Sequence, residues 1–253
     1  MNTQDNLSIL RLDQVSLQGS LGSDLLLQNI SFKIQPGEKI GIIGASGAGK
    51  TSLLRLLNNL VSPSAGTIYW HNNSTQQLKS VQLRRKIVLV NQEPKLLGMK
   101  VIDALSYPLQ LQKLGESEIQ RRIDALTNLL QIPREWSVKT ELQLSLGQRQ
   151  LVAITRALLL EPELLLLDEP TSALDLGIAG HVIRVLESLN QSQNITILMV
   201  NHQLELIKGF CDRFLFLNQG RLEEDIPATE SNWEKLRQKI LQQHTDHELD
   251  NWL

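Results

Sequence analysis

Apolar and polar residues alternate over the first part of the chain, which is the spacing of strands that bury one face. The alternation covers residues 8–20 and 25–35, so both segments are predicted as antiparallel strands. Pro36-Gly37 predicts a tight turn. Residues 40–43 are apolar without interruption and rich in β-branched side chains, which predicts a strand buried on both faces.

The pattern then changes from strands to helices and back to strands. After a turn at residues 63–66, strands are predicted at residues 67–70 and 87–90, with a polar loop over residues 71–80. From residue 101 to residue 159 the apolar positions take a helical spacing. One such helix starts near Ser117 and stops before Pro133, and its apolar face comprises Ile119, Ile123, Leu126 and Leu130.

Strands return at residues 164–167, 195–200 and 213–217, with a helix near residues 177–190. Strands that alternate with helices predict an α/β fold with a parallel sheet covered on both faces. We interpret residues 96–156 as a helical insertion in this domain.

Residues 229–253 are predicted as a separate terminal helix. Ser231 and Glu234 fit a capping box. The apolar stripe that follows comprises Trp233, Leu236 or Arg237, Ile240 and Leu241, with Leu249 and Trp252 as an extension. We expect the stripe to pack on the chain's own core. The alternatives are a second copy or a partner protein, and a membrane surface, which is disfavoured because acids match the basic residues of the tail.

Composition narrows the classes of function. The chain has 253 residues, of which 25 are basic and 27 acidic, for a formal net charge of -2. That balance gives no electrostatic footprint of nucleic-acid binding, so no nucleic-acid partner is expected. The single cysteine, Cys211, excludes an internal disulfide framework and is typical of a reducing compartment. The polar start predicts no secretory signal, and no apolar run approaches the ~20 residues of a membrane span.

A glycine-rich segment after the strand at residues 40–43 carries the main chemistry. It fits the pattern G-x-x-x-x-G-K-[ST] and precedes a predicted helix from Ser52, which favours a phosphate loop over a chance glycine-rich turn. Its residues are Gly44, Ala45, Ser46, Gly47, Ala48, Gly49, Lys50 and Thr51. The glycines let backbone N–H groups approach a phosphate at the helix N-terminus, Lys50 adds a positive charge, and the Thr51 hydroxyl can bind Mg²⁺.

Polar side chains also follow other predicted strands. Asp168 and Glu169 end the run at residues 164–167, where ligands bind in open α/β sheets. One carboxylate there can hold Mg²⁺ and the next can polarise a water for attack on phosphorus, whereas the alternative is a solvated acidic turn. Gln92 and His202 follow two further strands, and each alone would be an ordinary strand-end residue. Asn91 and Asn201 precede them and receive no role.

Together these motifs resemble the ATP-binding cassette (ABC) family over residues 8–224. Leu144-Ser145-Leu146-Gly147-Gln148 is similar to the family's Leu-Ser-Gly-Gly-Gln signature, and residues 164–169 to its Walker B strand. Residues 172–175, which end in Asp175, match its D-loop, Gln92 its Q-loop and His202 its switch histidine. Six motifs in the family's order are far more specific than any one of them.

The resemblance implies a P-loop NTPase core with a parallel sheet, an antiparallel β-subdomain and an inserted helical subdomain. The implied division is residues 7–95 and 157–228 for the α/β core with the β-subdomain, 96–156 for the helical signature subdomain and 229–253 for the tail. It also implies a dimer that sandwiches two ATP molecules, each between one phosphate loop and the signature of the other copy.

The resemblance further implies the roles of single residues, with ATP and Mg²⁺ as cofactors. Residues 44–51 and Ser52 would hold the phosphates. Ser145, Gly147 and Gln148 would reach ATP in the other copy, with Asp175 at the dimer interface. Thr51, Gln92 and Asp168 would hold Mg²⁺. For hydrolysis, Glu169 would be the general base, His202 would contact the γ-phosphate and Gln92 would assist.

Two positions depart from the family pattern. Leu146 replaces the first signature glycine, and its backbone N–H remains available for a phosphate. The family often has an aromatic residue near the position of Gly19, whereas the first aromatic residue here is Phe32, so no stacking partner for adenine is identified.

The commonest role of such a cassette is to hydrolyse ATP for an ABC transporter, peripheral on the cytoplasmic face of the membrane and bound to a multi-span permease. The helical subdomain and the Gln92 segment would form the groove for the permease. The variant signature resembles cassettes of the metal or metalloid exporter type. The alternative is a soluble ABC ATPase with a mechanical or assembly role. A nucleotide sensor without hydrolysis is disfavoured, because Glu169 and His202 are both present.

Overall fold

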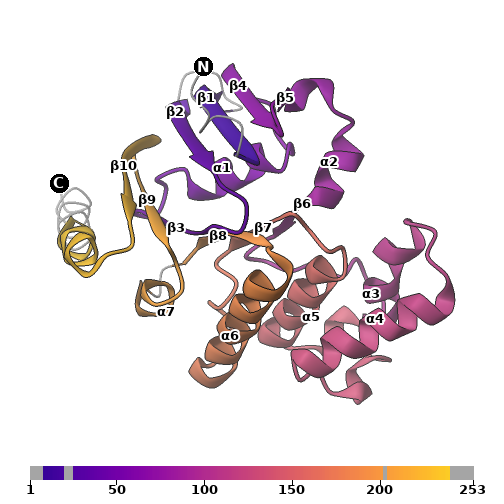
Figure 1. Ribbon diagram of the computed structural model, residues 1–253. Helices are drawn as coiled ribbons and strands as arrows, with labels where there is room; N and C mark the ends of the chain where they lie inside the picture. The colour runs from indigo at the N-terminus through magenta and orange to yellow at the C-terminus, as the bar shows by residue number, and fades with distance from the viewer. Residues whose placement is uncertain (1–7, 20–24, 202–203, 240–253) are drawn as a thin grey trace.

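The computed structural model describes residues 8–19, 25–201 and 204–239, and two sheets form its centre (Figure 1). The first is antiparallel, in the order β2-β1-β4-β5. Its strands are β1 (Leu10–Gln18), β2 (Leu25–Ile34), β4 (Ala65–Trp70) and β5 (Asn73–Ser74). Leu10 pairs with Ile34 and Leu12 with Phe32, which confirms the antiparallel pair predicted from the alternation.

The second sheet has the order β10-β9-β3-β8-β7-β6. Its strands are β3 (Lys39–Ile43), β6 (Ile87–Val90), β7 (Leu164–Asp168), β8 (Thr196–Val200), β9 (Arg213–Asn218) and β10 (Arg221–Pro227). The five strands from β9 to β6 are parallel, and β10 is antiparallel to β9. The predicted parallel sheet and α/β class are therefore confirmed.

The leucines of β7 divide the interior into two apolar clusters. Leu165 and Leu167 face the cluster that contains the apolar sides of the helices between residues 101 and 193. Leu164 and Leu166 face the cluster between this sheet, the antiparallel sheet and α1 (Lys50–Leu57). All four side chains are fully buried. Burial of each contributes about 1.5–3 kcal/mol, so β7 is fixed from both faces and holds the residues at its end in place.

Most helices lie on one side of the second sheet. α3 (Val101–Gln110) and α4 (Glu116–Leu129) form a lobe at the lower right of Figure 1, and α5 (Leu146–Leu158) lies between this lobe and α6 (Leu176–Gln193). The short helix α7 (Leu204–Lys208) precedes β9. The helical spacing predicted between residues 101 and 159 is confirmed. No helix within the described ranges has the length and apolarity that a membrane crossing needs.

Two elements differ from the sequence-based expectation. The predicted loop at residues 71–80 contains β5 and leads into α2 (Ser80–Lys86). Leu83 is the only buried residue of α2, and a single buried position gives no helical period to detect. β10 was not predicted either. It is an edge strand in which Glu223, Glu224 and Asp225 interrupt the apolar positions, and charged residues are common on such edges.

The described part of the tail packs on the chain's own core, as expected. Residues 230–239 are helical, and Trp233 lies against Phe214 of β9 with ring centroids 5.4 Å apart. Leu236 is also fully buried. The predicted cap at Ser231 is wrong. The helix starts two residues earlier, because the Thr229 hydroxyl accepts a hydrogen bond from the N–H of Asn232. The expected continuation of the stripe beyond residue 239 lies outside the described residues.

Candidate functional site

The glycine-rich segment forms the turn between β3 and α1, as its sequence predicts. Gly49 caps α1 with φ 100°, and a Cβ there would lie 2.8 Å from the carbonyl oxygen of Leu26. At Gly44 a Cβ would lie 2.1 Å from the carbonyl oxygen of Leu217. Both positions therefore require glycine, which keeps the loop backbone tight at the helix N-terminus. Ser52 lies in the first turn of the same helix.

The side chain of Lys50 folds back over this loop. Its Nζ donates hydrogen bonds of 2.7 Å to the carbonyl oxygens of Gly44 and Ala45. Burial lowers the pKa of Lys50 below its ordinary value, although the nearby carboxylates of Glu169 and Asp168 oppose that shift. An anion in the loop would stabilise the charged form, so the site is suited to phosphate groups.

Thr51 and Asp168 meet between α1 and the end of β7. The Thr51 hydroxyl donates a 2.8 Å hydrogen bond to the carboxylate of Asp168, and Asp168 is buried. A hydroxyl and a carboxylate are the hard oxygen ligands that Mg²⁺ prefers, so these two residues fit the ion chemically.

Glu169 follows in an unusual backbone conformation. Its φ is 49°, a left-handed value that costs about 1–3 kcal/mol for a residue with a side chain. The conformation is held by a hydrogen bond from its N–H to Val200 and by one from the Ser172 hydroxyl to its carbonyl oxygen. The Gln92 amide also donates a 2.8 Å hydrogen bond to its carboxylate. Gln92, Asp168 and Glu169 thus lie together at the carboxyl ends of β6 and β7, as the strand pattern predicts.

The predicted signature begins α5. Ser145 is the N-cap, its hydroxyl accepts a hydrogen bond from the N–H of Gln148, and the Gln148 side chain accepts one from the N–H of Ser145. This capping box orders the first turn, at the positive end of the helix dipole. Leu146 lies on the outside of that turn with 46% of its surface exposed. A Cβ at Gly147 would lie 2.5 Å from the carbonyl oxygen of Ala173, so the signature packs closely against residues 172–175.

Asp175 is the N-cap of α6. Its carboxylate accepts a 2.9 Å hydrogen bond from the N–H of Ile178. The structure thus gives Asp175 a local role in addition to the one that the resemblance implies.

The site residues of a single chain fall into two groups. The first group is connected by contacts and comprises the phosphate loop, Asp168, Glu169 and Gln92. Across the described ranges, no hydrogen bond or ion pair connects this group to Ser145, Gly147 or Gln148. The predicted site residue His202 lies outside the described residues.

One residue near the site was missed from the sequence. Asn201 is buried at the end of β8, and its amide donates a 2.8 Å hydrogen bond to the hydroxyl of the fully buried Thr171. It therefore fixes the loop that follows Glu169. The only sequence signal for this role was the position of Asn201 at the end of a strand. Many polar residues at strand ends have no such role, so the signal was not specific.

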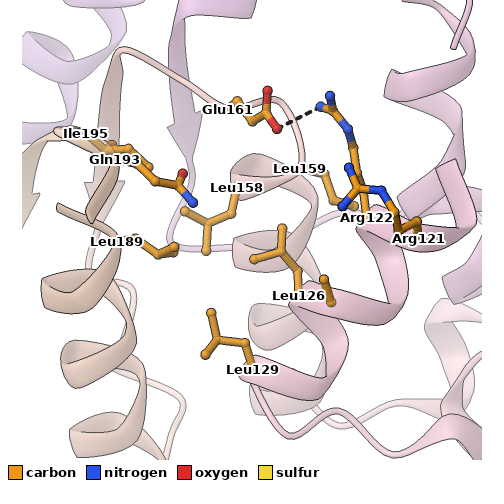
Figure 2. A pocket seen from close by; sticks show the side chains of 11 residues that line it. Arg121, Arg122, Leu126, Leu129, Leu158, Leu159, Glu161, Leu189, Gln193 and Ile195 are labelled. Carbon is orange, nitrogen blue, oxygen red and sulfur yellow. Dashed lines mark ion pairs between the residues drawn. The ribbon is translucent and has the colours of Figure 1, made fainter. Parts of the chain in front are cut away.

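A separate cavity of about 240 Å³ lies between α4, α5 and α6 (Figure 2). Leucine side chains of the three helices line it, and the ion pair between Arg122 and Glu161, at 2.9 Å, closes part of its rim. None of the predicted site residues contributes to its wall.

Comparisons with known proteins agree with this geometry. Residues 27–172 match the ABC transporter family. The chain is 39% identical over 206 residues to the methionine import ATP-binding protein MetN of Francisella tularensis subsp. holarctica (strain OSU18), covering 80% of this chain and 59% of that protein. It is 37% identical over 202 residues to the MetN of Haemophilus influenzae (strain ATCC 51907 / DSM 11121 / KW20 / Rd), covering 78% and 58%. The chain therefore spans about three fifths of the length of these relatives.

Two solved structures are similar over most of their length. One is the dimeric ATP-binding cassette MJ0796 in a post-hydrolysis state with ADP and Pi, with a TM-score of 0.79 and 27% identity, covering 87% of this chain and 99% of that one. The other is cbiO1 from Clostridium perfringens, part of the ABC transporter complex cbiONQ. Its TM-score is 0.79 at 29% identity, covering 97% of this chain and 99% of that one.

Proposed function

The chain belongs to the ABC transporter family as an ATPase cassette with the P-loop NTPase fold, and from this premise we propose that it hydrolyses ATP to power transport through a separate membrane permease. The observation that carries the proposal is the connected group at the ends of β3, β6 and β7. Lys50 covers the phosphate loop, Thr51 contacts Asp168, and Gln92 holds Glu169. Phosphoryl transfer depends mainly on positioning and charge stabilisation, which such a group provides.

Each residue of this group has a distinct role in the proposed reaction. Lys50 and the amides of residues 44–52 bind the phosphates of ATP. Thr51 and Asp168 would hold Mg²⁺, with Gln92 as a further oxygen donor, and the ion would supply positive charge against the phosphate oxygens. Glu169 orients a water and takes up its proton at the carboxylate, while Gln92 fixes the direction of that carboxylate.

A second copy of the chain completes the site. Ser145, Gly147 and Gln148 have no polar contact with the phosphate loop in the described part of one chain, yet Ser145 caps a helix whose N-terminus is suited to a phosphate. The similar cassette MJ0796 is a dimer. We assign these residues to the ATP held by the other copy, with Asp175 between the copies and His202 at the γ-phosphate.

A groove near Gln92 is the proposed place of the permease. It has a volume of about 400 Å³ and is lined by Pro94 after β6, by Tyr107 and Pro108 of α3, and by Arg156 of α5. Its mixed apolar and polar wall is suited to a short amphipathic helix. This would place the chain on the cytoplasmic face of the membrane.

The relatives favour import. Both MetN proteins are named as import ATP-binding proteins, so we assign this chain to an importer. They give no support to the metal or metalloid exporter type expected from the signature. The soluble mechanical role is not favoured either, because cbiO1 is also part of a transporter complex. The division into residues 7–95 with 157–228, 96–156 and 229–253 remains our proposal for the domains.

The proposal is tested by phosphate release from ATP by the full chain, with and without Mg²⁺, for the parent and Lys50→Ala. We expect Mg²⁺-dependent release by the parent, and a loss of ATP affinity of at least about 100-fold in the variant, since a charge-assisted phosphate contact disappears. Release without Mg²⁺, or normal ATP affinity in Lys50→Ala, would contradict the assignment.

A further inference from the structure

One carboxylate joins the segment after Gln92 to the signature helix. Glu141 starts the short 3-10 helix η4 (Glu141–Gln143), directly before the signature. Its Oε2 accepts hydrogen bonds from the N–H groups of Leu96, at 3.0 Å, and Gly98, at 3.4 Å. Its Oε1 lies 3.5 Å from Nη1 of Arg149 in α5. The turn at residues 96–98, which is distant in the sequence, and the start of α5 therefore meet at one side chain.

The turn at residues 96–98 is shaped to hold this carboxylate. Leu97 and Gly98 have φ values of 58° and 72°, and the N–H of Met99 donates to the carbonyl oxygen of Leu96 at 3.1 Å. Neighbouring N–H groups in such a turn form a concavity for anions. The fully buried side chain of Leu96 anchors the turn, so its amides keep their direction.

Glu141 is itself fixed in place. Gln143 accepts a hydrogen bond from the N–H of Thr140 at 2.9 Å, and Val101 at the start of α3 donates one to the carbonyl oxygen of Lys139 at 3.0 Å. Burial opposes ionisation of Glu141, but the two amides and Arg149 outweigh it, and the pKa of Glu141 lies below its ordinary value. The carboxylate is thus charged at neutral pH and bound on both sides.

Each partner of Glu141 leads to a part of the site. Arg149 lies one turn from Ser145, since its N–H donates to the carbonyl oxygen of Ser145 at 3.0 Å. This hydrogen bond and the capping box hold the first turn of α5 together, so we expect a shift of Arg149 to be passed to Ser145. On the other side, the turn at residues 96–98 continues the segment of Gln92, whose amide holds Glu169.

We propose that Glu141 is a positioning residue that ties the Gln92 segment to the signature helix, so that a movement of either one is passed to the other. The inference rests on the proposed function, in which the signature acts on ATP bound to the second copy. Glu141 touches no substrate in this account. Loss of the tie leaves ATP binding at the phosphate loop unchanged and lowers turnover, because the signature no longer follows the Gln92 segment.

The test compares Glu141→Gln, Arg149→Gln and the double variant in the full chain. Glu118→Gln is the matched control, because Glu118 also pairs with arginines, Arg121 and Arg122, but does so within α4. We expect kcat for ATP to fall about ten-fold in each single variant and no further in the double variant, as expected for residues that act as a coupled pair. KM for ATP stays near that of the parent, and the control keeps its kcat.

An unchanged kcat in Glu141→Gln, effects that multiply in the double variant, or an equal loss in Glu118→Gln would each overturn the inference. If the parent releases no phosphate, the proposed function fails instead, and amide hydrogen exchange without nucleotide decides the inference. Faster exchange at both residues 95–100 and 146–150 in Glu141→Gln supports the tie. A change confined to residues 95–100 overturns it.

Discussion

The side-chain amide of Gln92 donates a 2.8 Å hydrogen bond to the carboxylate of Glu169. The two residues follow the neighbouring strands β6 and β7, and they lie 77 positions apart in the sequence. Glu169 is held in a left-handed backbone conformation, so its carboxylate reaches Gln92 from a constrained position. The proposed base is thus oriented by the segment that borders the proposed permease groove.

Removal of this orientation should affect turnover more than binding. We expect Gln92→Ala to lower kcat about ten-fold with little change in KM, because ATP is held mainly by the phosphate loop. The control is Gln120→Ala, which removes a similar amide-to-carboxylate hydrogen bond of 3.0 Å, from Gln120 to Asp124 on α4. Steady-state phosphate release as a function of ATP separates the two constants. A rise in KM at constant kcat would show that Gln92 serves binding instead.

The signature should tolerate glycine at one position and reject alanine at the next. Leu146 is 46% exposed, and any phosphate contact there comes from its backbone N–H, so Leu146→Gly should keep the rate of phosphate release within a few-fold. In Gly147→Ala the new Cβ would meet the Ala173 carbonyl oxygen at 2.5 Å, so this variant should lose most activity. A rise in the rate of phosphate release by orders of magnitude in Leu146→Gly would mean that the natural leucine inhibits the site.

The tail helix should contribute stability without a role in dimerisation. Trp233 is 2% exposed and packs on Phe214, so Trp233→Ala should lower the free energy of unfolding by about 3–5 kcal/mol. Glu234→Ala on the exposed face is the control. Urea unfolding and ATP-dependent dimerisation are measured together. Unchanged stability with lost dimerisation in Trp233→Ala would mean that the helix packs against another chain.

Stability should depend on pH through Glu141. Its pKa is lowered in the folded chain from the ordinary 4.5, so the folded state binds fewer protons than the unfolded state. This contribution is complete above pH 4.5 and is lost as the pH falls through the lower folded value. In urea titrations, the difference in unfolding free energy between the parent and Glu141→Gln should therefore be constant near neutrality and shrink below pH 4.5. A difference that grows on acidification would show that the pKa of Glu141 is raised in the folded chain, not lowered.

Local patterns in the sequence predicted much of the fold and the group of residues at the phosphate loop. The β-branched run before Gly44 and the leucine run before Asp168 are continuous signals, and both strands lie where they were predicted. α2 depends on a single buried side chain, Leu83, and so has no apolar period. The contact of Glu141 with Leu96 joins residues 45 positions apart, and no local pattern records such a pairing.

The position of a helix cap is likewise not determined by the local sequence pattern alone. Ser231 and Thr229 are both suitable N-cap residues, and in the structure it is the Thr229 hydroxyl that accepts the hydrogen bond from the N–H of Asn232. The hydrogen bond of Asn201 to Thr171 likewise requires β8 to lie beside β7, which the order of strands in the chain does not determine.

The central claim is that Glu169 is the base of an ATPase that works as a dimer. The most direct test measures phosphate release and molar mass by light scattering for the parent chain and Glu169→Gln, with ATP and Mg²⁺. The account predicts that the variant binds ATP as the parent does, hydrolyses it at least about 100-fold more slowly, and accumulates as an ATP-bound dimer. Hydrolysis by Glu169→Gln at the rate of the parent would contradict the account.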